Sequence, residues 1–281
     1  MRKLTIPPHI HWLIDNGERL QTSDGKEIKV FEFQHKNDDA ILSAWATHFR
    51  NQYCADKDID DLRNGTGLTR KDYLINLKFP SEKHDEKDSS SILGPSIRAG
   101  DFAELLISDY LEFLLGYFVP RTRYDHKTIR NESPKASDLI GFKISQLDNF
   151  SPDDEMFIFE VKAKFTSPVD GNRLQDAVNG SSKDDLRKAE SLNAIKQRYK
   201  TEKKRKEKQL IERFQDKVGK PFIEKSGAVA FLEKEVFNKT NFSQTDTSAH
   251  TNQNNLFVIA VKGEKMMPLV HELYRRAADE A

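Results

Sequence analysis

A carboxylate and an amine stand two residues apart at the end of a strongly apolar segment. Residues 156–165 read MFIFEVKAKF, so Glu160 and Lys162 follow four bulky apolar residues. Alternate side chains of a β-strand share a face, and two such residues lie about 7 Å apart along it. Glu160 and Lys162 therefore point the same way and can meet. A surface ion pair would look the same in the sequence, so other residues must decide between the two interpretations.

A second acid, Asp138, opens the preceding apolar segment, DLIGFKI. We expect residues 138–144 to form a strand that pairs antiparallel with residues 155–165 through a short loop. Pairing centred on that loop places Asp138 opposite about Lys162, and so beside Glu160. An aspartate at the start of a strand is also common in turns, which leaves a structural role open.

A third acid, Glu104, lies on the clearest helix that the sequence predicts, residues 98–117. Counting by three and four places Glu104 beside Ile107 and Leu111, at the border of the buried face. The same count places Asp109 and Glu112 on the solvated face. An ion-paired, purely structural glutamate is the alternative interpretation of Glu104.

Three carboxylates and a lysine near one point have a definite chemistry. Carboxylate oxygens are the ligands that Mg²⁺ and Mn²⁺ prefer, and a divalent cation removes their mutual repulsion. Such a site can hydrolyse a phosphodiester, because the metal activates water and stabilises charge on the phosphate oxygens. Lys162 would orient the attacking water or stabilise the developing negative charge.

The order of these motifs resembles a known group of enzymes, the PD-(D/E)xK nuclease superfamily. More specifically, residues 93–200 resemble the HamA family, the nuclease subunit of the Hachiman anti-phage system. The resemblance is carried by RAGDFAELLISDYLEFLLGYFVPRTRY, KASDLIGFK and FEVKAKF. It implies that Asp138 and Glu160 bind metal, that Lys162 is the catalytic lysine and that Glu104 is the helical acid. Ser137 precedes Asp138, where the superfamily's name has proline.

The resemblance also implies an architecture and a biological role. The expected fold is α/β, with a restriction-endonuclease-like core in which helices flank a mixed central sheet. This nuclease-like domain would span residues 93–281, after an N-terminal α+β extension, 1–92, that could dock a partner. The implied activity is that of a Mg²⁺- or Mn²⁺-dependent DNA endonuclease in bacterial antiviral defence, regulated by a superfamily 2 helicase subunit (HamB-like). A catalytically silent module that binds DNA or the helicase is the alternative.

A basic run is a candidate nucleic-acid contact. Residues 196–208, KQRYKTEKKRKEK, hold eight basic and two acidic residues. On a helix such a run can neutralise phosphates and give salt-dependent binding. A solvated helical face with pairs such as Glu202–Lys206, or contact with an acidic partner protein, would explain it equally. Candidate DNA-binding residues are Lys164, Lys183, Arg187, Lys203, Lys204 and Arg205.

Composition limits the remaining possibilities. The 281 residues include 45 basic and 45 acidic ones, so no global charge indicates nucleic acid. The single cysteine, Cys54, excludes an internal disulfide and fits a reducing compartment. No glycine-rich phosphate loop occurs, so a helicase activity would belong to a partner. The N-terminus does not resemble a signal peptide and no segment has the length of a membrane span, so we expect a cytoplasmic protein without membrane contact.

The pattern of apolar residues predicts the other elements, in an order of α/β character. Residues 227–237 fit either a strand or a helix, and the segment after residue 165, with its glycines, is expected to be a loop. The remaining loops are expected at 81–91 and 238–255, and the remaining strands at 26–33, 74–79, 118–124 and 256–261. The remaining helices are expected at 38–53 and 268–279, and residues 182–217 are expected to form one long helix or two joined ones.

Overall fold

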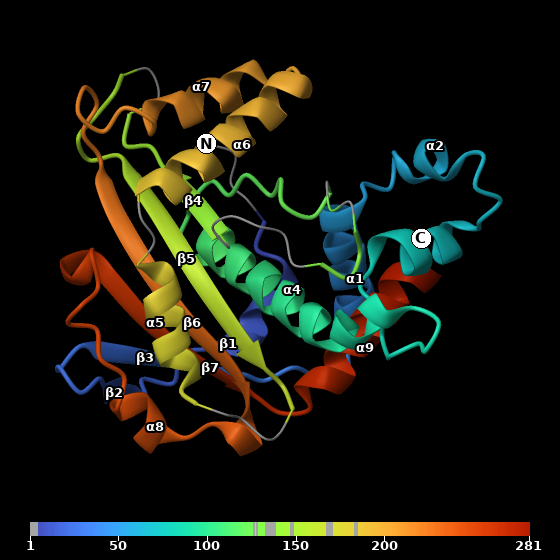
Figure 1. Cartoon of the computed structure of the whole chain (residues 1–281), viewed down its shortest axis with the longest axis horizontal. Helices are drawn as coiled ribbons and strands as arrows, with labels where there is room; N and C mark the ends of the chain where they lie inside the picture. The colour runs from blue at the N-terminus through green and yellow to red at the C-terminus, as the bar shows by residue number, and fades with distance from the viewer. Residues whose placement is uncertain are drawn as a thin grey trace.

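The computed structural model describes residues 5–125, 127, 129–132, 139–146, 149–166, 171–182 and 185–281. These residues form a mixed α/β fold in which helices flank a curled sheet (Figure 1). The strand order is β1-β3-β7-β6-β5-β4, and β2 pairs with the N-terminal end of β3. None of the helices in this part of the chain is both long and apolar enough to cross a membrane.

The centre of the sheet is parallel and its margins are antiparallel. β5, β6, β7 and β3 run parallel, whereas β4 pairs antiparallel with β5, and β1 and β2 pair antiparallel with β3. The strands are β1 (Leu13–Ile14), β2 (Arg19–Gln21), β3 (Glu27–Phe33), β4 (Leu139–Lys143), β5 (Glu155–Lys164), β6 (Ile223–Glu233) and β7 (Leu256–Gly263). The strands expected at 26–33, 138–144, 155–165 and 256–261 are thus confirmed.

Nine α-helices and several short 3₁₀ or π turns are found in the described part of the chain. The helices are α1 (Asp39–Tyr53), α2 (Ile59–Arg63), α3 (Arg70–Tyr73), α4 (Gly94–Asp109), α5 (Arg173–Ser181), α6 (Asp185–Thr201), α7 (Arg205–Arg213), α8 (Lys239–Ser243) and α9 (Met266–Asp279). The 3₁₀ turns are Pro8–Trp12, Ser89–Leu93, Lys234–Val236 and Gln253–Asn255, and the π turns are Leu74–Lys78 and Tyr110–Leu114.

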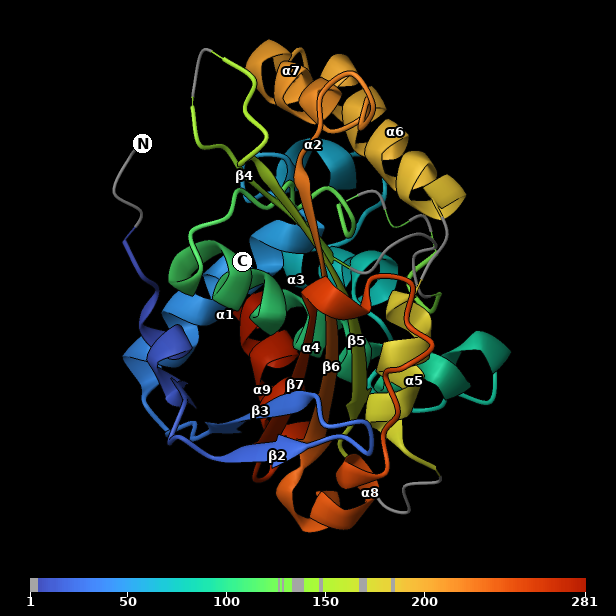
Figure 2. The ribbon, with the colours of Figure 1, turned by 90° about the vertical axis from the view of Figure 1, so that its left-hand side faces the viewer.

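Each face of the sheet has its own helical layer (Figure 2). α1, α4 and α9 cover one face, where the largest core contains the aromatic side chains of Phe33, Trp45, Phe102, Phe159 and Phe231. On the other face α5 packs against β5 and β6, and α6 and α7 pack against β4 and β5. The two layers together exclude water from both faces of the parallel strands, as such sheets require.

Several expected elements differ in the structure. The segment expected as a strand at 74–79 is helical: residues Leu74–Lys78 form a π turn, and Leu74 and Phe79 reach the main core from it. Residues 118–124 contribute only an isolated bridge between Phe118 and Phe142. Residues 227–237 are mainly strand, which is one of the two forms expected for them. α5 occupies a segment that was expected to be a loop, and α8 lies within the loop expected at 238–255. The expected helix at 98–117 starts earlier, at Gly94, and ends in a π turn before Gly116, whose φ of 74° suits a glycine at a helix end.

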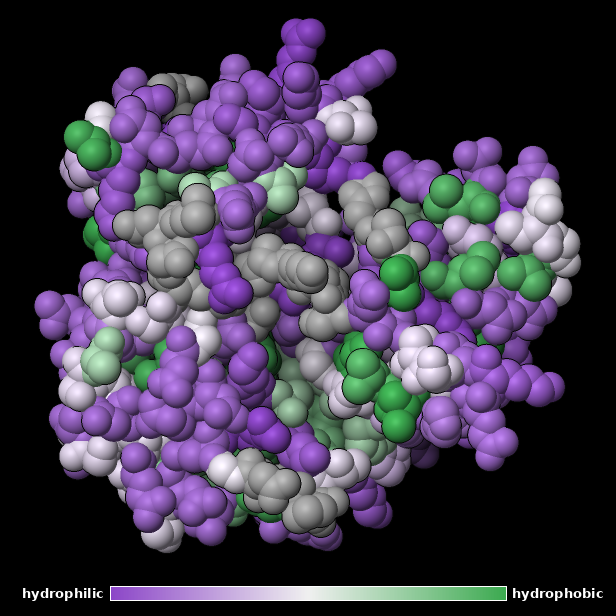
Figure 3. Space-filling model, viewed as in Figure 1, coloured by the Kyte–Doolittle hydropathy of each residue, from purple (hydrophilic) through white to green (hydrophobic). Residues whose placement is uncertain are grey.

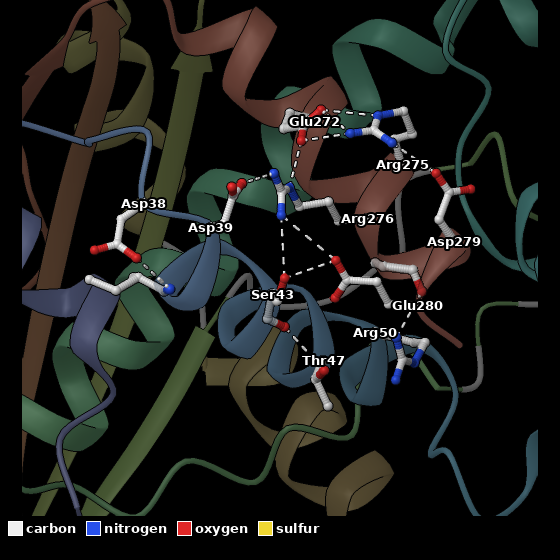
Figure 4. Close-up of polar contacts among 12 residues, drawn as sticks. Asp38, Asp39, Ser43, Thr47, Arg50, Glu272, Arg275, Arg276, Asp279 and Glu280 are labelled. Atoms are coloured by element: carbon white, nitrogen blue, oxygen red, sulfur yellow. Dashed lines mark hydrogen bonds and ion pairs between the residues drawn. The ribbon is translucent and has the colours of Figure 1, made fainter.

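A polar seam holds α1 against α9 (Figure 4). Arg276 of α9 bonds Asp39 and Glu272, and Ser43 of α1 donates to Glu280 at 2.9 Å. Deeper in the seam, the Arg50 Nη1 donates to the carbonyl of Ala277 at 3.0 Å. Residues before position 92 therefore share a core, and through β3 and β7 also a sheet, with residues after it.

Candidate functional site

Glu160 and Lys162 form the centre of the candidate site. They lie near the C-terminal end of β5, and the Lys162 Nζ is 2.7 Å from the Glu160 Oε1. Glu160 is 5% exposed, whereas Lys162 is half-buried. The expectation that the two side chains meet is therefore confirmed.

The position of this pair along the sheet is also informative. The β5–β6 ladder continues to Lys164, but the described β4–β5 ladder ends at the pair Leu139–Phe159. The β4–β5 pairing differs by two residues from the pairing expected for a loop centred between the strands. Because side chains alternate with a period of two, this shift leaves each β4 residue on the same face of the sheet. Glu160 and Lys162 thus follow directly after the last described β4–β5 pair.

Gly180 lets α5 approach the Glu160 carboxyl group closely. A Cβ atom at position 180 would be 2.8 Å from the Cδ and Oε1 of Glu160, closer than real side chains pack. The helix is nucleated by Asn172, whose Oδ1 accepts from the amides of Leu174 and Gln175 at 3.0 and 3.3 Å. Sequence reasoning missed Gly180. The capping asparagine and the apolar spacing at 174, 177 and 178 were the available signals.

The end of α5 is fixed by His250, which is buried. Its Nε2 is 3.0 Å from the Ser181 Oγ, which donates to the carbonyl of Val178 at 2.9 Å. The amide of Asn252 donates to the His250 Nδ1 at 3.0 Å, so the neutral imidazole carries its proton on Nε2. Burial lowers the pKa of His250, and the charges of Lys188 and Lys26 lower it further.

Glu104 lies on α4, on the opposite side of β5 from α5. Phe102 packs on Phe165, with ring centroids 6.0 Å apart, so this part of α4 lies beside the C-terminal half of β5. Glu104 is 7% exposed and accepts hydrogen bonds from the Tyr124 hydroxyl and, at 3.5 Å, from the Arg123 Nη2. The Arg123 Nε lies 3.2 Å from its Oε2. Burial and the Glu104 charge raise the pKa of Tyr124 well above its ordinary value, so Tyr124 stays a hydrogen-bond donor.

A second buried carboxylate on α4 belongs to a network beside Glu104. The Asp101 Oδ2 lies 2.9 Å from the Lys127 Nζ and accepts from the Tyr53 hydroxyl at 2.7 Å. The Tyr53 hydroxyl is also 2.6 Å from that of Tyr274 on α9. This network fixes the helix that carries Glu104 to α1 and α9.

Asp109 was expected to face solvent, and that expectation is wrong. It is 1% exposed, and its carboxylate lies 2.9 Å from the Nε2 atoms of His9 and His48 and 2.6 Å from the Arg121 Nη2. Burial alone would raise its pKa, but the charge of Arg121 and the histidine hydrogen bonds hold the pKa well below its ordinary value. Glu112 is likewise paired, with Arg121 at 2.6 Å.

Not every predicted site residue can be placed. Asp138 and Lys183 lie outside the described residues. Among the residues that are described, no group of three or more histidine, cysteine, aspartate or glutamate side chains could hold a metal ion. The roles of Glu104, Asp138, Glu160 and Lys162 in metal binding and catalysis stay predictions.

The basic run forms the junction of two joined helices, one of the two arrangements expected for residues 182–217. Lys203 has a φ of 58° and separates α6 from α7, and Lys203, Lys204 and Arg205 are exposed there. Lys203 and Arg205 line a hollow of about 470 Å³ with Tyr199 and Lys208. The surface over α6 and α7 is mostly hydrophilic (Figure 3).

The other candidate DNA contacts are more dispersed. Arg187 is exposed on α6, and Lys164 is half-buried at the end of β5. The predicted pair Glu202–Lys206 is wrong: Glu202 bonds Arg198 and, at 2.7 Å, Lys204, because the helix breaks between positions 202 and 206. DNA binding by the candidate residues stays a prediction.

The fold and the site define a mixed α/β protein in which strand β5 ends in a buried glutamate paired with a half-buried lysine. A family model, HamA, matches residues 8–277, nearly the whole chain. The chain therefore belongs to the HamA family of anti-phage defence proteins. No curated protein and no solved structure matches the chain.

Proposed function

We propose that the protein is a DNA nuclease of the PD-(D/E)xK type that depends on Mg²⁺ or Mn²⁺. The observation that carries the proposal is the Glu160–Lys162 pair. A glutamate that is 5% exposed is held 2.7 Å from a half-exposed lysine, just beyond the last described β4–β5 pair. Membership of the HamA family supports a role of this activity in defence.

The donor chemistry fits a divalent cation. Carboxylate oxygens are hard ligands, and Glu160 presents its carboxyl group against Gly180, in a space that a Cβ would fill. Asp138, by the family resemblance, would add a second carboxylate. Glu104, the expected helical acid, lies on the α4 side of β5, across the strand from the Glu160–Gly180 contact. When bound, the metal would supply Lewis-acid activation of water and of the scissile phosphate.

The protein's own residues would position the reactants. Lys162 donates to Glu160, which fixes the direction of the ammonium group near the reacting phosphate. From there it would hold the attacking water and offset the charge that develops on the phosphate oxygens. Arg123 and Tyr124 would hold the Glu104 carboxylate in one rotamer, because both contact its oxygens.

The DNA backbone would run across the exposed residues at the α6–α7 junction. Lys203 and Arg205 are exposed beside a hollow that also contains Lys208, a geometry that suits contact with successive phosphates. Lys164 and Arg187, together with Lys183, would extend this contact toward Glu160. The junction is part of the same layer that covers the Glu160 face of the sheet.

The regulatory partner would be a helicase subunit in the bacterial cytoplasm. No phosphate-binding loop occurs in this chain, so strand separation would require a superfamily 2 (HamB-like) partner. Residues 1–92 are the proposed docking region for it.

The proposal is tested with purified protein, supercoiled plasmid and Mg²⁺ or Mn²⁺. We expect the wild type to nick or degrade the plasmid, and Glu160→Gln and Lys162→Ala to lower the rate by at least about a hundredfold. Glu155→Gln is the matched control, because Glu155 also bonds a lysine, Lys225 at 2.7 Å, at the opposite end of the same strand.

The same assay separates the alternative function. A folded wild type that binds DNA in a mobility-shift assay but leaves it intact with either metal, in the absence of any partner, would identify a silent binding module. Equal cleavage by wild type and Glu160→Gln would place the chemistry elsewhere.

A further inference from the structure

Arg98, near the start of α4, is a buried cation that has only one distant carboxylate partner among the described residues. Its side chain is 5% exposed, and the nearest acid, Glu82, lies 3.8 Å away with its own side chain 60% exposed. A guanidinium stays protonated in proteins, so this charge is weakly compensated in a place where desolvation is costly. Burial lowers the pKa of Arg98 accordingly.

Neutral groups hold the Arg98 guanidinium in place. Its Nε donates to the carbonyl of Pro80 at 2.7 Å, and its Nη1 lies 3.3 Å from the His271 Nδ1. The ring of Tyr274 lies beneath it, 4.6 Å from the guanidinium carbon. These contacts use one edge and one face of the guanidinium, and within the described residues no hydrogen bond uses Nη2.

The guanidinium lines a cavity of about 690 Å³ that carries further cations. Lys83 and Lys87 are exposed at this cavity, and neither forms a hydrogen bond or an ion pair through its ammonium group with the described part of the chain. Asp279, one of the acidic lining residues, is already bound by Lys71 at 2.8 Å and by Arg275 at 2.9 Å. The other acids, Glu82, Asp85 and Glu86, are exposed.

The wall of the cavity is fixed before any ligand arrives. A Cβ at Gly94 would be 2.3 Å from the carbonyl oxygen of Ser81, so only glycine lets this loop lie on the start of α4. The Ser81 amide donates to the Asn131 Oδ1 at 2.8 Å, and Asn131 is 2% exposed. A preformed pocket of this size is in the range that binds small molecules.

We propose that this cavity binds a phosphate group, with Arg98 as its fixed donor and Lys83 and Lys87 closing over the anion. A planar guanidinium that offers paired N–H donors matches phosphate geometry, and flexible lysines add point charges. The cavity is larger than phosphate alone, so the group would belong to a nucleotide or to the end of a DNA strand. The inference does not depend on the proposed nuclease activity, because it concerns different residues.

The test is calorimetric titration of the full chain with inorganic phosphate, adenosine 5′-monophosphate and adenosine. We expect both phosphate-bearing probes to bind and adenosine to fail. The double variant Lys83→Glu/Lys87→Glu should weaken binding of the monophosphate by at least about tenfold, since both charges are exposed and their replacement spares the core. Lys36→Glu, an exposed lysine at a different hollow, should leave the affinity unchanged.

Two further arms complete the test. Comparing 5′-phosphorylated with 5′-hydroxyl oligonucleotides, in the wild type and in the double variant, distinguishes a DNA end from a free nucleotide. Arg98→Lys keeps the charge but loses the paired donors, and a folded variant should bind more weakly than the wild type. Absence of phosphate and monophosphate binding, or equal binding by wild type and double variant, would overturn the proposal.

Discussion

The two faces of the central sheet differ in the size and chemistry of their side chains. Along β6, Val229 and Phe231 point to the layer of α1, α4 and α9, whereas Ala228 and Ala230 point to α5. Along β5, the first face carries Phe157, Phe159 and Val161, and the second ends in Glu160 and Lys162. One face is filled by aromatic rings, and the other admits a helix at close range.

This difference separates the face that contributes most to stability from the face that carries the candidate site. Bulky side chains on one face provide most of the buried apolar surface, because large aromatic groups contribute most per residue. Small side chains on the other face let α5 come near enough for Gly180 to touch Glu160. The face that carries Glu160 and Lys162 is therefore shaped by its small side chains as much as by its charged ones.

The largest expected effect is on the aromatic face. Phe231 is fully buried, with its ring 4.9 Å from that of Phe165 and 6.0 Å from that of Phe33. Phe231→Ala should lower the free energy of unfolding by about 3–5 kcal/mol through the cavity it leaves, measured by urea denaturation. Phe257→Ala removes a ring that is 46% exposed and should cost far less. Equal losses from the two variants would contradict the comparison.

On the face that carries Glu160 and Lys162, we expect Gly180→Ala to have a smaller effect on stability and a selective effect on the cleavage rate. The added methyl would displace the Glu160 carboxylate, and a misplacement of about 1 Å can lower a catalytic rate about a hundredfold. The midpoint of thermal unfolding should change little, because alanine favours the helix. The measurement is the plasmid cleavage rate of the folded variant.

Gly100→Ala is the matched control for this substitution. Gly100 is also a helical glycine, in α4, and a Cβ there would meet no atom within 4 Å. Its cleavage rate should equal that of the wild type. If Gly180→Ala cleaves at the wild-type rate, the close contact with α5 does not set the position of Glu160.

The basic junction between α6 and α7 should show a weaker effect, on binding alone. Replacing Lys203 and Arg205 by glutamine removes two exposed charges, so the slope of log affinity against log salt should fall by about 2. Lys239→Gln is the control, because Lys239 is exposed but paired with Glu18 at 2.7 Å. An unchanged slope, measured by fluorescence anisotropy with a labelled duplex, would assign the basic run to another partner.

A feature of the fold or of the candidate site could be predicted from the sequence when neighbouring residues along the chain determine it. The strands around Glu160 were predictable, because runs of β-branched and aromatic residues mark buried strands without knowledge of their neighbours. The Glu160–Lys162 contact follows from the same alternation. α5 was missed because it has only nine residues and ends in Gly180 and Ser181, which read as a loop.

Asp109 shows where local reasoning fails. Helical periodicity predicted that Asp109 lies on the side of the helix that faces away from the core. That prediction considers only the helix itself and not the segments that pack on it. His9 and His48 come from segments 100 and 61 residues away and cover that side, so the aspartate is buried by a second layer. A pattern within one helix cannot indicate such a layer.

The smallest expected effect is a pH dependence of stability that arises from His250, which contacts the end of α5 on the face that carries Glu160. Its pKa is lowered in the folded protein by burial, whereas the unfolded chain titrates near 6.5. The unfolded state therefore binds more protons as the pH falls, so this contribution to stability is present above about pH 6.5 and is lost below it. Protonation of Nδ1 would also break the bond from the Asn252 amide, because a protonated imidazole accepts no hydrogen bond.

The variant His250→Gln separates this effect from those of His9 and His271, the two other histidines whose pKa values are lowered by burial. We expect the wild type to exceed the variant in thermal midpoint at pH 7.5, and the difference to shrink as the pH falls through 6 to 5. A difference that stays constant with pH would mean that His250 holds Ser181 and the end of α5 by packing alone. In that case the position of α5 beside Glu160 would not depend on the protonation of His250.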